Sequence, residues 1–275
     1  MIKNSILHYS SESDIIRFQE ERLKETLEYL SQNSPFYKRM FKENNIDISQ
    51  IKHLSDLQKL PVTTKEDLQK RNNEFICIDK ESIIDYVTTS GTLGDPVTFA
   101  LSNNDLDRLA YNEASSFTMA GCKKGDIIQL MTTIDRRFMA GLAYFLGARE
   151  LGCGIIRVGN GIPELQWDTI QRVSPNVCIV VPSFLMKLIK YAEDNGIDYN
   201  NSSLKKAICI GEALRTPTGE YTTLGKKISE KWPNLELYST YASTEMQSSY
   251  TECQEHSGCH IPTDLILVEM LDDNM

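Results

Sequence analysis

Residues 177–181, Val177-Cys178-Ile179-Val180-Val181, carry an apolar side chain at every position. A short run of this kind predicts a strand buried on both faces, as in a parallel sheet covered by helices on each side. The segments on either side of it have apolar residues at helical spacing, over 164–173 and 184–195, and Gly196 is a typical helix stop. The run therefore predicts a buried strand between two helices.

The same alternation continues in both directions along the chain. We expect further strands at 126–131, 154–158, 204–210 and 235–240, and further helices at 105–120, 138–151 and from Thr216-Pro217 to Trp232. Thr216 suits the N-cap and Pro217 the first helical position of the last of these helices. Strands that alternate with helices of this length predict the α/β class, with a mostly parallel sheet flanked by helices.

The N-terminal residues 1–80 are expected to form a helical cover, and residues 81–275 the α/β core. Residues 12–44 are charged and helical in period, and their apolar pattern ends near Ser34-Pro35. A short helix is expected from Thr63 or Thr64, and residues 265–271 resemble a strand that runs into a turn. We find no linker that would divide the chain into two domains.

The composition restricts the class of protein. The 275 residues are 41% hydrophobic and carry a formal charge of -9, unlike nucleic-acid binders, which usually present a basic stripe. No apolar run reaches membrane-spanning length, and the N-terminus lacks the apolar core of a secretory signal. The seven cysteines are mostly scattered singly, which is typical of reduced thiols. We expect a cytoplasmic protein without nucleic-acid or membrane partners.

A segment rich in hydroxyl groups and glycine lies at residues 86–99, Tyr86-Val87-Thr88-Thr89-Ser90-Gly91-Thr92-Leu93-Gly94-Asp95-Pro96-Val97-Thr98-Phe99. It predicts a strand, a tight loop and a second strand. Its glycines let the backbone approach a ligand, and its successive N–H groups and hydroxyls suit phosphate oxygens. It lacks the lysine of the common phosphate-binding loop, and no helix follows directly. Taken alone, it is better explained as a surface hairpin.

Three predicted strand ends carry small or polar residues: Pro182-Ser183, Gly211-Glu212-Ala213 and Tyr241-Ala242-Ser243-Thr244-Glu245. Ligands of such sheets bind beyond the carboxyl ends of the strands. Each of the three segments alone is typical of an ordinary strand-to-helix turn, and only their combination with the loop at 86–99 is informative.

These motifs, in this order, resemble those of the adenylate-forming enzymes. Residues 89–96 are similar to the family's phosphate loop S-G-T-T-G-x-P, and residues 241–245 to its Y-G-x-T-E motif. Gly211-Glu212-Ala213 lies where the family has the turn that flanks adenine. Residues 34–37, 60–63, 181–184 and 258–261 further resemble the phenylacetate–coenzyme A ligase branch.

The resemblance implies the fold of the large N-terminal domain of these enzymes and a two-step reaction. A carboxylic acid, aryl or related, reacts with ATP to give an acyl-adenylate, and coenzyme A then takes the acyl group as a thioester. The protein needs no nucleophile for the first step, because the substrate carboxylate attacks the α-phosphorus; it must position groups and neutralise charge.

The resemblance also implies roles for single residues. Ser90, Thr92 and the backbone of Gly91 and Gly94 would hold the β- and γ-phosphates. Thr244 and Glu245 would be catalytic, Thr244 by donating to the α-phosphate and Glu245 by holding Mg²⁺. Tyr241 would stack on adenine, with Gly211, Glu212 and Ala213 along its edge and Ala242 and Ser243 in the same nucleotide-binding segment. The alternatives are a core aromatic residue for Tyr241 and a solvated acid at a helix start for Glu245.

The chain departs from the family pattern at several positions. Leu93 and Val97 replace a frequent Thr and Lys of the phosphate loop, and Ala242 replaces a Gly. By the resemblance, Arg136 and Arg137 lie where the acyl pocket is expected, so either they argue against phenylacetate as the acid or they begin a helix in solvent. The family continues past this point to a ribose-binding Asp and a mobile C-terminal domain with a catalytic Lys. We therefore expect residues 1–275 to be a truncated, poorly active form of the enzyme.

Two cysteines and two histidines fall within eight residues: Cys253, His256, Cys259 and His260. Thiolate and imidazole suit Zn²⁺, but four ligands from so short a loop would be cramped. By the resemblance, Cys253 and His260 are the best two ligands of a structural zinc ion, with two cysteines beyond residue 275. Whether His256 or Cys259 also binds the metal stays open, and His260 could instead face the acyl site.

Two other functions compete with the ligase hypothesis. One is a non-catalytic nucleotide-binding domain, stabilised by zinc and derived from this fold. The other is an unrelated enzyme such as a dehydrogenase, which ranks last because the first strand–turn–helix lacks G-x-G-x-x-G. Members of the ligase branch are often dimeric, and the sequence leaves a homodimer open.

Overall fold

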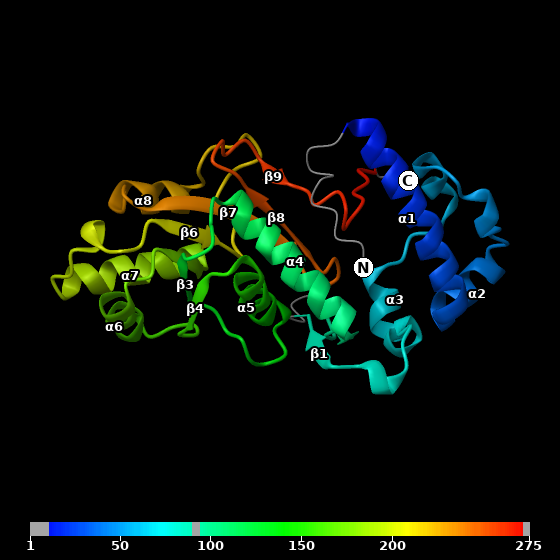
Figure 1. Cartoon of the computed structure of the whole chain (residues 1–275), viewed down its shortest axis with the longest axis horizontal. Coiled ribbons are helices and arrows are strands. Elements are labelled where there is room, and N and C mark those ends of the chain that lie inside the picture. Colours follow the sequence, from blue (N-terminus) through cyan, green and yellow to red (C-terminus); the bar gives the residue numbers. More distant parts are fainter. Residues whose placement is uncertain (1–10, 90–93, 272–275) are drawn as a thin grey trace. The chain divides into compact units, whose positions relative to one another are not determined.

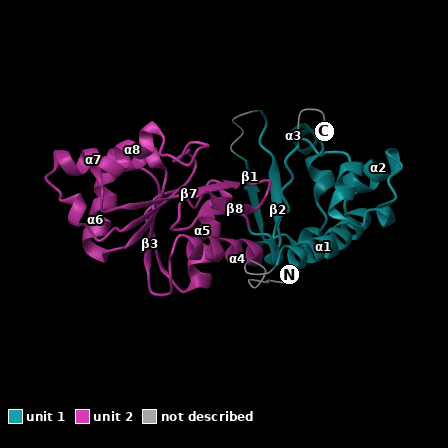
Figure 2. Ribbon diagram, turned by 90° about the horizontal axis from the view of Figure 1, so that it is seen from above, with its two compact units in different colours: residues 1–105, 262–275 teal, residues 106–261 magenta. Residues whose placement is uncertain are grey.

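The structure is a computed structural model and describes residues 11–89 and 94–271 (Figure 1). The chain divides into two compact units, one of residues 1–105 and 262–275 and one of residues 106–261 (Figure 2). Their boundary differs from the one expected at residue 80, because the hairpin after residue 80 belongs to the first unit.

The second unit is built on a seven-stranded sheet. Its strands, in spatial order, are β4 (Gly154–Arg157), β3 (Ile127–Leu130), β5 (Val177–Val180), β6 (Lys206–Cys209), β7 (Glu236–Ser243), β8 (Ser248–Glu252) and β9 (Cys259–His260). The pairs from β4 to β7 are parallel, and the pairs β7–β8 and β8–β9 are antiparallel. The predicted α/β class with a mostly parallel sheet is confirmed.

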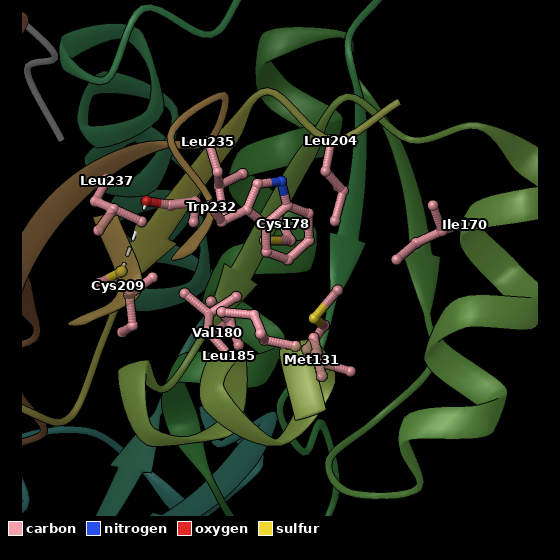
Figure 3. Close-up of a cluster of buried hydrophobic side chains, with 14 of the residues drawn as sticks. Met131, Ile170, Cys178, Val180, Leu185, Leu204, Cys209, Trp232, Leu235 and Leu237 are labelled. Atoms are coloured by element: carbon pink, nitrogen blue, oxygen red, sulfur yellow. Dashed lines mark hydrogen bonds between the residues drawn. The ribbon is translucent and has the colours of Figure 1, made fainter. Parts of the chain in front are cut away.

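Helices cover both faces of this sheet. Cys178 and Val180 of β5 face an apolar cluster with α6 (Pro163–Val173), α7 (Pro182–Asp194) and α8 (Thr223–Lys231), shown in Figure 3. Val177 and Ile179 face a second cluster with α4 (Asn103–Met119) and α5 (Met139–Leu151). The run at 177–181 is apolar throughout because successive strand residues point to opposite faces and both faces are buried.

Strand β7 changes partner along its length. Residues 236–239 pair in parallel with β6, and residues 240–243 pair antiparallel with β8. The strand therefore extends three residues beyond its expected end at 240, because β8 supplies hydrogen-bond partners. A local sequence pattern does not predict this pairing.

Two predicted elements are wrong. The helix expected from Thr216-Pro217 begins at Thr223, because residues 215–221 form a small hairpin closed by an Arg215–Tyr221 bridge. Gly219, with a φ of 86°, supplies the turn, and the hydroxyl of Thr222 caps the helix instead. The strand expected at 265–271 is absent from the residues that the structure describes, since these residues find no strand partner there.

The first unit is largely helical. Its described residues include α1 (Glu12–Asn33), α2 (Pro35–Glu43), α3 (Lys65–Lys70) and the short 3-10 turns η2 (Ile48–Gln50), η3 (Leu54–Lys59), η4 (Asn72–Phe75) and η5 (Lys80–Ser82). Ser34 ends α1 and caps α2 through its hydroxyl, and Pro35 follows at the first helical position. The helical cover is thus two helices with a break at Ser34-Pro35, packed around Leu27, Phe41 and Ile51.

The first unit ends in a two-stranded hairpin of β1 (Asp85–Thr88) and β2 (Thr98–Leu101). The strand–loop–strand prediction for this segment is confirmed for its strands. A further 3-10 turn, η6 (Tyr199–Asn201), lies in the second unit. None of the helices in residues 11–89 and 94–271 combines the length and the apolarity that a membrane span requires.

Candidate functional site

The base of the loop between β1 and β2 is well defined. Thr89 is buried, and it exchanges two hydrogen bonds with Val97: its N–H donates to the carbonyl oxygen of Val97, and its hydroxyl accepts from the N–H of Val97, both at 3.0 Å. Gly94 has a φ of 124°, and a Cβ there would lie 3.0 Å from the amide nitrogen of Gln69. Ser90, Gly91, Thr92 and Leu93 lie outside the described residues.

The turn at residues 211–213 lies beyond the carboxyl end of β6. Gly211 has a φ of 75°, which favours glycine, and Glu212 is exposed. One carboxylate oxygen of Glu212 accepts a hydrogen bond of 2.8 Å from the N–H of Ser183, in the first turn of α7. The predicted strand ends at 182–183 and 211–213 therefore lie next to one another.

The motif at residues 241–245 is a β-hairpin rather than a strand-to-helix turn. Tyr241, Ala242 and Ser243 are the last residues of β7, and Thr244 and Glu245 lie in the turn that leads to β8. The Tyr241 side chain is 61% exposed, so the alternative of a core aromatic residue does not hold. Glu245 is exposed and has no hydrogen-bond or ion-pair partner among the described residues.

The register brings two of these segments to the same edge of the sheet. Cys209 of β6 pairs in parallel with Ser239 of β7, so Gly211 and Tyr241 each lie two residues beyond that pair. The segments 182–183, 211–213 and 241–245 thus lie at the carboxyl ends of three neighbouring strands, β5, β6 and β7. The predicted meeting of the phosphate loop with Thr244 and Glu245 stays a prediction, because residues 90–93 are outside the described part of the chain.

The four candidate zinc ligands lie in β9 and in the connection that leads to it. His260 pairs with Thr251 across β8 and β9, and Cys253 follows the last residue of β8, Glu252, in that connection. Cys259 pairs with Glu252, and its thiol donates weakly to the carbonyl oxygen of Ser239 at 3.8 Å. His256 Nδ1 lies 3.1 Å from Glu252 Oε2.

Burial, with the nearby Glu252 carboxylate, raises the pKa of the Cys259 thiol to about 11, so the thiol is protonated at neutral pH. The described residues contain no group of three or more His, Cys, Asp or Glu side chains arranged to hold a metal ion. The assignment of Cys253 and His260 as zinc ligands therefore stays a prediction.

The arginines of the expected acyl pocket lie in the connection between β3 and α5. Arg136 and Arg137 both have left-handed backbone conformations, with φ of 59° and 60°, and both are exposed. The helix after them begins at Met139, so they precede the helix rather than form its first turn.

Sequence reasoning missed a cavity of about 410 Å³ beyond the carboxyl ends of β3, β4 and β5. Its lining mixes apolar and polar side chains, including Met131, Thr132, Asn160, Phe184 and Lys187, and contains neither arginine. The sequence signal that could have indicated this cavity is Gly159-Asn160-Gly161, close after the predicted strand at 154–158. Both glycines have positive φ in the structure.

Sequence reasoning also missed two buried carboxyl groups. Glu113 of α4 is 4% exposed, and burial raises its pKa to about 7, although hydrogen bonds from Ser249 and Asn112 oppose the shift. Glu252 of β8 is 2% exposed and forms an ion pair of 2.6 Å with Arg215. Both look like ordinary surface acids in the sequence, because their partners lie far away along the chain.

Comparison with known proteins gives the family. Residues 19–274 match the family model described as AMP-binding enzyme. The chain is 29% identical to the phenylacetate-coenzyme A ligase of Thermus thermophilus over 259 residues, covering 92% of this chain and 56% of that protein. It is 32% identical to the phenylacetate-coenzyme A ligase of Escherichia coli over 203 residues, covering 72% of this chain and 46% of that protein.

The chain spans about half the length of the curated relatives that it matches. Among solved structures, it is similar to 2-hydroxyisobutyryl-CoA ligase in complex with 2-HIB-AMP and CoA, with a TM-score of 0.80 and 23% identity. That similarity covers 90% of this chain and 54% of the other, and it shows a shared fold. The fold and the match over residues 19–274 lead to one conclusion: the chain belongs to the AMP-binding enzyme family.

Proposed function

We propose that this chain forms the nucleotide-binding part of an ATP-dependent acid–thiol ligase. A carboxylate attacks the α-phosphorus of ATP, which gives an acyl-adenylate and releases pyrophosphate. The thiol of coenzyme A then attacks the acyl carbon, AMP leaves, and the thiol proton passes to solvent. The observation that carries the proposal is the alignment of residues 182–183, 211–213 and 241–245 along one carboxyl edge, in a chain of this family.

The adenine is held by the residues that follow β6 and β7. The exposed ring of Tyr241 offers a stacking face, and the turn at Gly211-Glu212-Ala213 lies at the neighbouring strand end along the edge of the base. Ala242 and Ser243 continue the same strand toward the phosphates. The open backbone at Gly211, where a Cβ would meet only Val181 at 3.9 Å, leaves room for a flat ligand.

The phosphate-binding roles come from the resemblance to the family. Thr244 donates to the α-phosphate, and Ser90, Gly91, Thr92 and Gly94 hold the β- and γ-phosphates. Glu245 fits a ligand of Mg²⁺, since its carboxylate is exposed and has no partner among the described residues. When bound, the metal ion neutralises negative charge on the phosphate oxygens.

Three further parts of the proposal concern the wider protein. By the resemblance, Cys253 and His260 would be two ligands of a structural zinc ion, since thiolate and imidazole are the side chains that Zn²⁺ prefers. A cytoplasmic location agrees with seven free cysteines and with the use of ATP and coenzyme A. A homodimer is the assembly expected from the resemblance to phenylacetate–coenzyme A ligases.

The test is titration of the full chain with AMP and with ATP and Mg²⁺ by calorimetry, followed by ATP–pyrophosphate exchange with a panel of aryl and short-chain acids. We expect nucleotide binding, and exchange only when a suitable acid is present. Binding without exchange for every acid favours the non-catalytic nucleotide-binding domain. A chain that binds neither nucleotide contradicts the proposal.

A further inference from the structure

The point at which β7 changes partner lies directly before the proposed nucleotide-binding residues. Ser239 is the last residue paired with β6, and Thr240 is the first paired with β8. Tyr241 follows immediately. A strand that leaves one neighbour and joins another has no regular ladder at the junction, so other contacts must determine its direction there.

The carboxylate of Glu252 supplies those contacts. Its Oε2 accepts a hydrogen bond of 2.9 Å from the backbone N–H of Ser239, which is the group at the junction. The same carboxylate accepts from Arg215 Nε at 2.6 Å through Oε1, and His256 Nδ1 lies 3.1 Å from Oε2. Every contact of this buried group is therefore charge-assisted or directed at a backbone donor.

Arg215 connects the same carboxylate to the turn after β6. It follows Gly211-Glu212-Ala213 by two residues and begins the small hairpin at 215–221. Its Nη1 donates to the carbonyl oxygen of Gly219 at 3.2 Å, and its guanidinium carbon lies 4.3 Å from the centre of the Tyr221 ring. The guanidinium thus holds the hairpin closed while it pairs with Glu252.

We propose that Arg215 and Glu252 are positioning residues that hold the turn at 211–213 and the hairpin at 241–245 in register for the adenine nucleotide. The inference rests on the proposed function and adds two residues to it. Neither side chain contacts the nucleotide, because Arg215 is only 13% and Glu252 only 2% exposed. They act by fixing the backbone on both sides of the base, where misplacement of binding groups lowers affinity.

The alternative is that the pair only stabilises the fold, as a buried ion pair can when its partners are both present. The two roles predict different AMP affinities for a folded variant. If the pair only stabilises the fold, its loss lowers the free energy of unfolding, but the folded variant binds AMP as well as the unaltered chain does. Loss of a positioning pair weakens AMP binding even in a fully folded variant.

The experiment compares Arg215→Met, Glu252→Gln and the double variant with the unaltered chain. The double variant is needed because Arg215→Met alone leaves a buried carboxylate without its ion-pair partner and risks unfolding. AMP affinity is measured by calorimetry well below the unfolding temperature. Backbone hydrogen exchange is measured by mass spectrometry on peptides that contain residues 211–222 and 239–250.

We expect faster exchange in both peptides and AMP affinity lower by roughly tenfold in each folded variant. Arg215→Lys keeps the positive charge, but a lysine cannot contact both Gly219 and Tyr221 as the guanidinium does. The AMP affinity of this variant should therefore lie between those of Arg215→Met and the unaltered chain.

Two controls separate positioning from stability. Leu188→Ala destabilises the apolar cluster away from this pair, and Lys231→Met breaks the half-exposed ion pair with Glu193; both should keep AMP affinity within about twofold.

Variants that bind AMP like the unaltered chain, whatever their stability, overturn the positioning role and leave the proposed function intact. Unchanged exchange at 211–222 and 239–250 overturns it as well. If the unaltered chain binds no AMP, the proposed function fails first, and with it any role of the pair in binding nucleotide.

Discussion

The apolar cover of the central sheet and the contact of α4 with β8 are held together by different physical means. On one side, α6, α7 and α8 cover the strands through the apolar cluster of Figure 3, and Trp167 stacks on Trp232 at a ring distance of 5.7 Å. On the other side, α4 and α5 cover the central strands with a second apolar cluster, but α4 contacts β8 through a seam of polar side chains, in which Asn112 bonds to Ser248 and Ser249. Both kinds of interface are buried, but only the seam between α4 and β8 consists of groups that require specific partners.

The polar seam continues along α4 toward the end of β8. Ser116 bonds to Thr251, whose hydroxyl lies 3.0 Å from that of Thr240 in β7. Glu113 lies between these pairs, and one of its carboxyl oxygens has no hydrogen-bond partner in the described part of the chain. The hairpin with Thr244 and Glu245 therefore rests on directional hydrogen bonds, whereas the turn at 211–213 follows strands packed on an apolar layer.

This difference has consequences for stability. Apolar packing does not depend on pH, so the cluster around Trp167 should contribute equally across the range in which the protein folds. The seam contains an ionisable group with a raised pKa, so its contribution should change with pH. Variants of both interfaces can test this difference in pH dependence, and the apolar interface should show the largest loss of stability.

Trp167→Ala should have the largest effect on stability. The side chain is 2% exposed, stacks on Trp232 and donates from Nε1 to the carbonyl oxygen of Leu188 at 3.0 Å. We expect a loss of about 3–5 kcal/mol in the free energy of unfolding, by urea denaturation, with the same loss at pH 5 and pH 8. Trp167→Phe is the matched control and should lose less, and a strongly pH-dependent loss for Trp167→Ala would remove the distinction between the two interfaces.

Glu113→Gln should change the pH dependence of stability. Because the pKa of Glu113 is raised from 4.5 to about 7 in the folded chain, the unfolded chain loses this proton at lower pH than the folded chain. The unfolded state then binds fewer protons between pH 4.5 and 7, so stability falls through this window as pH rises and is constant above it. The total loss is about 3 kcal/mol, since a tenfold difference in proton affinity between the two states corresponds to roughly 1.4 kcal/mol.

The variant cannot ionise, so its stability should stay level through that window and exceed that of the unaltered chain at pH 8. Urea denaturation at pH 4.5, 6 and 8 measures both proteins. Tyr144 of α5 also lies near this carboxyl group, and burial holds its pKa well above the usual range, so it does not titrate in this window. Parallel pH profiles for the two proteins would show that Glu113 is ionised in the folded chain.

Ser116→Ala and Thr251→Val should each cost about 1–3 kcal/mol, because each change removes the hydrogen bond between these two buried hydroxyls. The double variant should cost less than the sum, since both hydroxyls are then absent. Urea denaturation of the four proteins gives the coupling free energy. Additive losses would mean that the two groups do not depend on each other, and that the seam behaves like the apolar layer.

Glu245→Gln should leave stability unchanged, because its carboxylate has no partner among the described residues. It should weaken ATP binding in the presence of Mg²⁺ by roughly tenfold and leave AMP binding within about twofold. Calorimetry with both nucleotides measures this. Glu21→Gln is the matched control, at an exposed acid of α1 that likewise has no hydrogen-bond or ion-pair partner among the described residues. Equal losses for ATP and AMP in Glu245→Gln would rule out the metal role.

The apolar packing of the sheet could be predicted from the sequence, and the polar seam between α4 and β8 could not. The run at 177–181 and the helical spacing around it are local patterns, and they indicated the strand, its two helices and the parallel sheet. Asn112, Glu113 and Ser116 are locally indistinguishable from a solvated helix face. Their partners on β8 lie 135 to 137 residues away along the chain, so no short pattern reveals that they are buried.

The same reason explains the errors at the candidate site. The motif residues 211–213 and 241–245 could be found because their spacing and residue types are local. The extension of β7 to Ser243 depends on its pairing with β8, and the hairpin at 215–221 is closed by the Arg215–Tyr221 bridge; neither contact is a local sequence pattern. The sequence thus indicated which residues to consider at the site, and the tertiary contacts determine how their backbone runs.

The central claim is that the carboxyl edge of β6 and β7 binds an adenine nucleotide, with Tyr241 against the base. The most direct measurement is calorimetric titration of the unaltered chain and of Tyr241→Ala with AMP, with Tyr29→Ala as a control at an exposed tyrosine outside this edge. We expect Tyr241→Ala to lose roughly tenfold in affinity at unchanged stability, because one base–aromatic contact is worth about 1–3 kcal/mol, while Tyr29→Ala binds like the unaltered chain. Equal AMP affinity for the unaltered chain and Tyr241→Ala would contradict the claim.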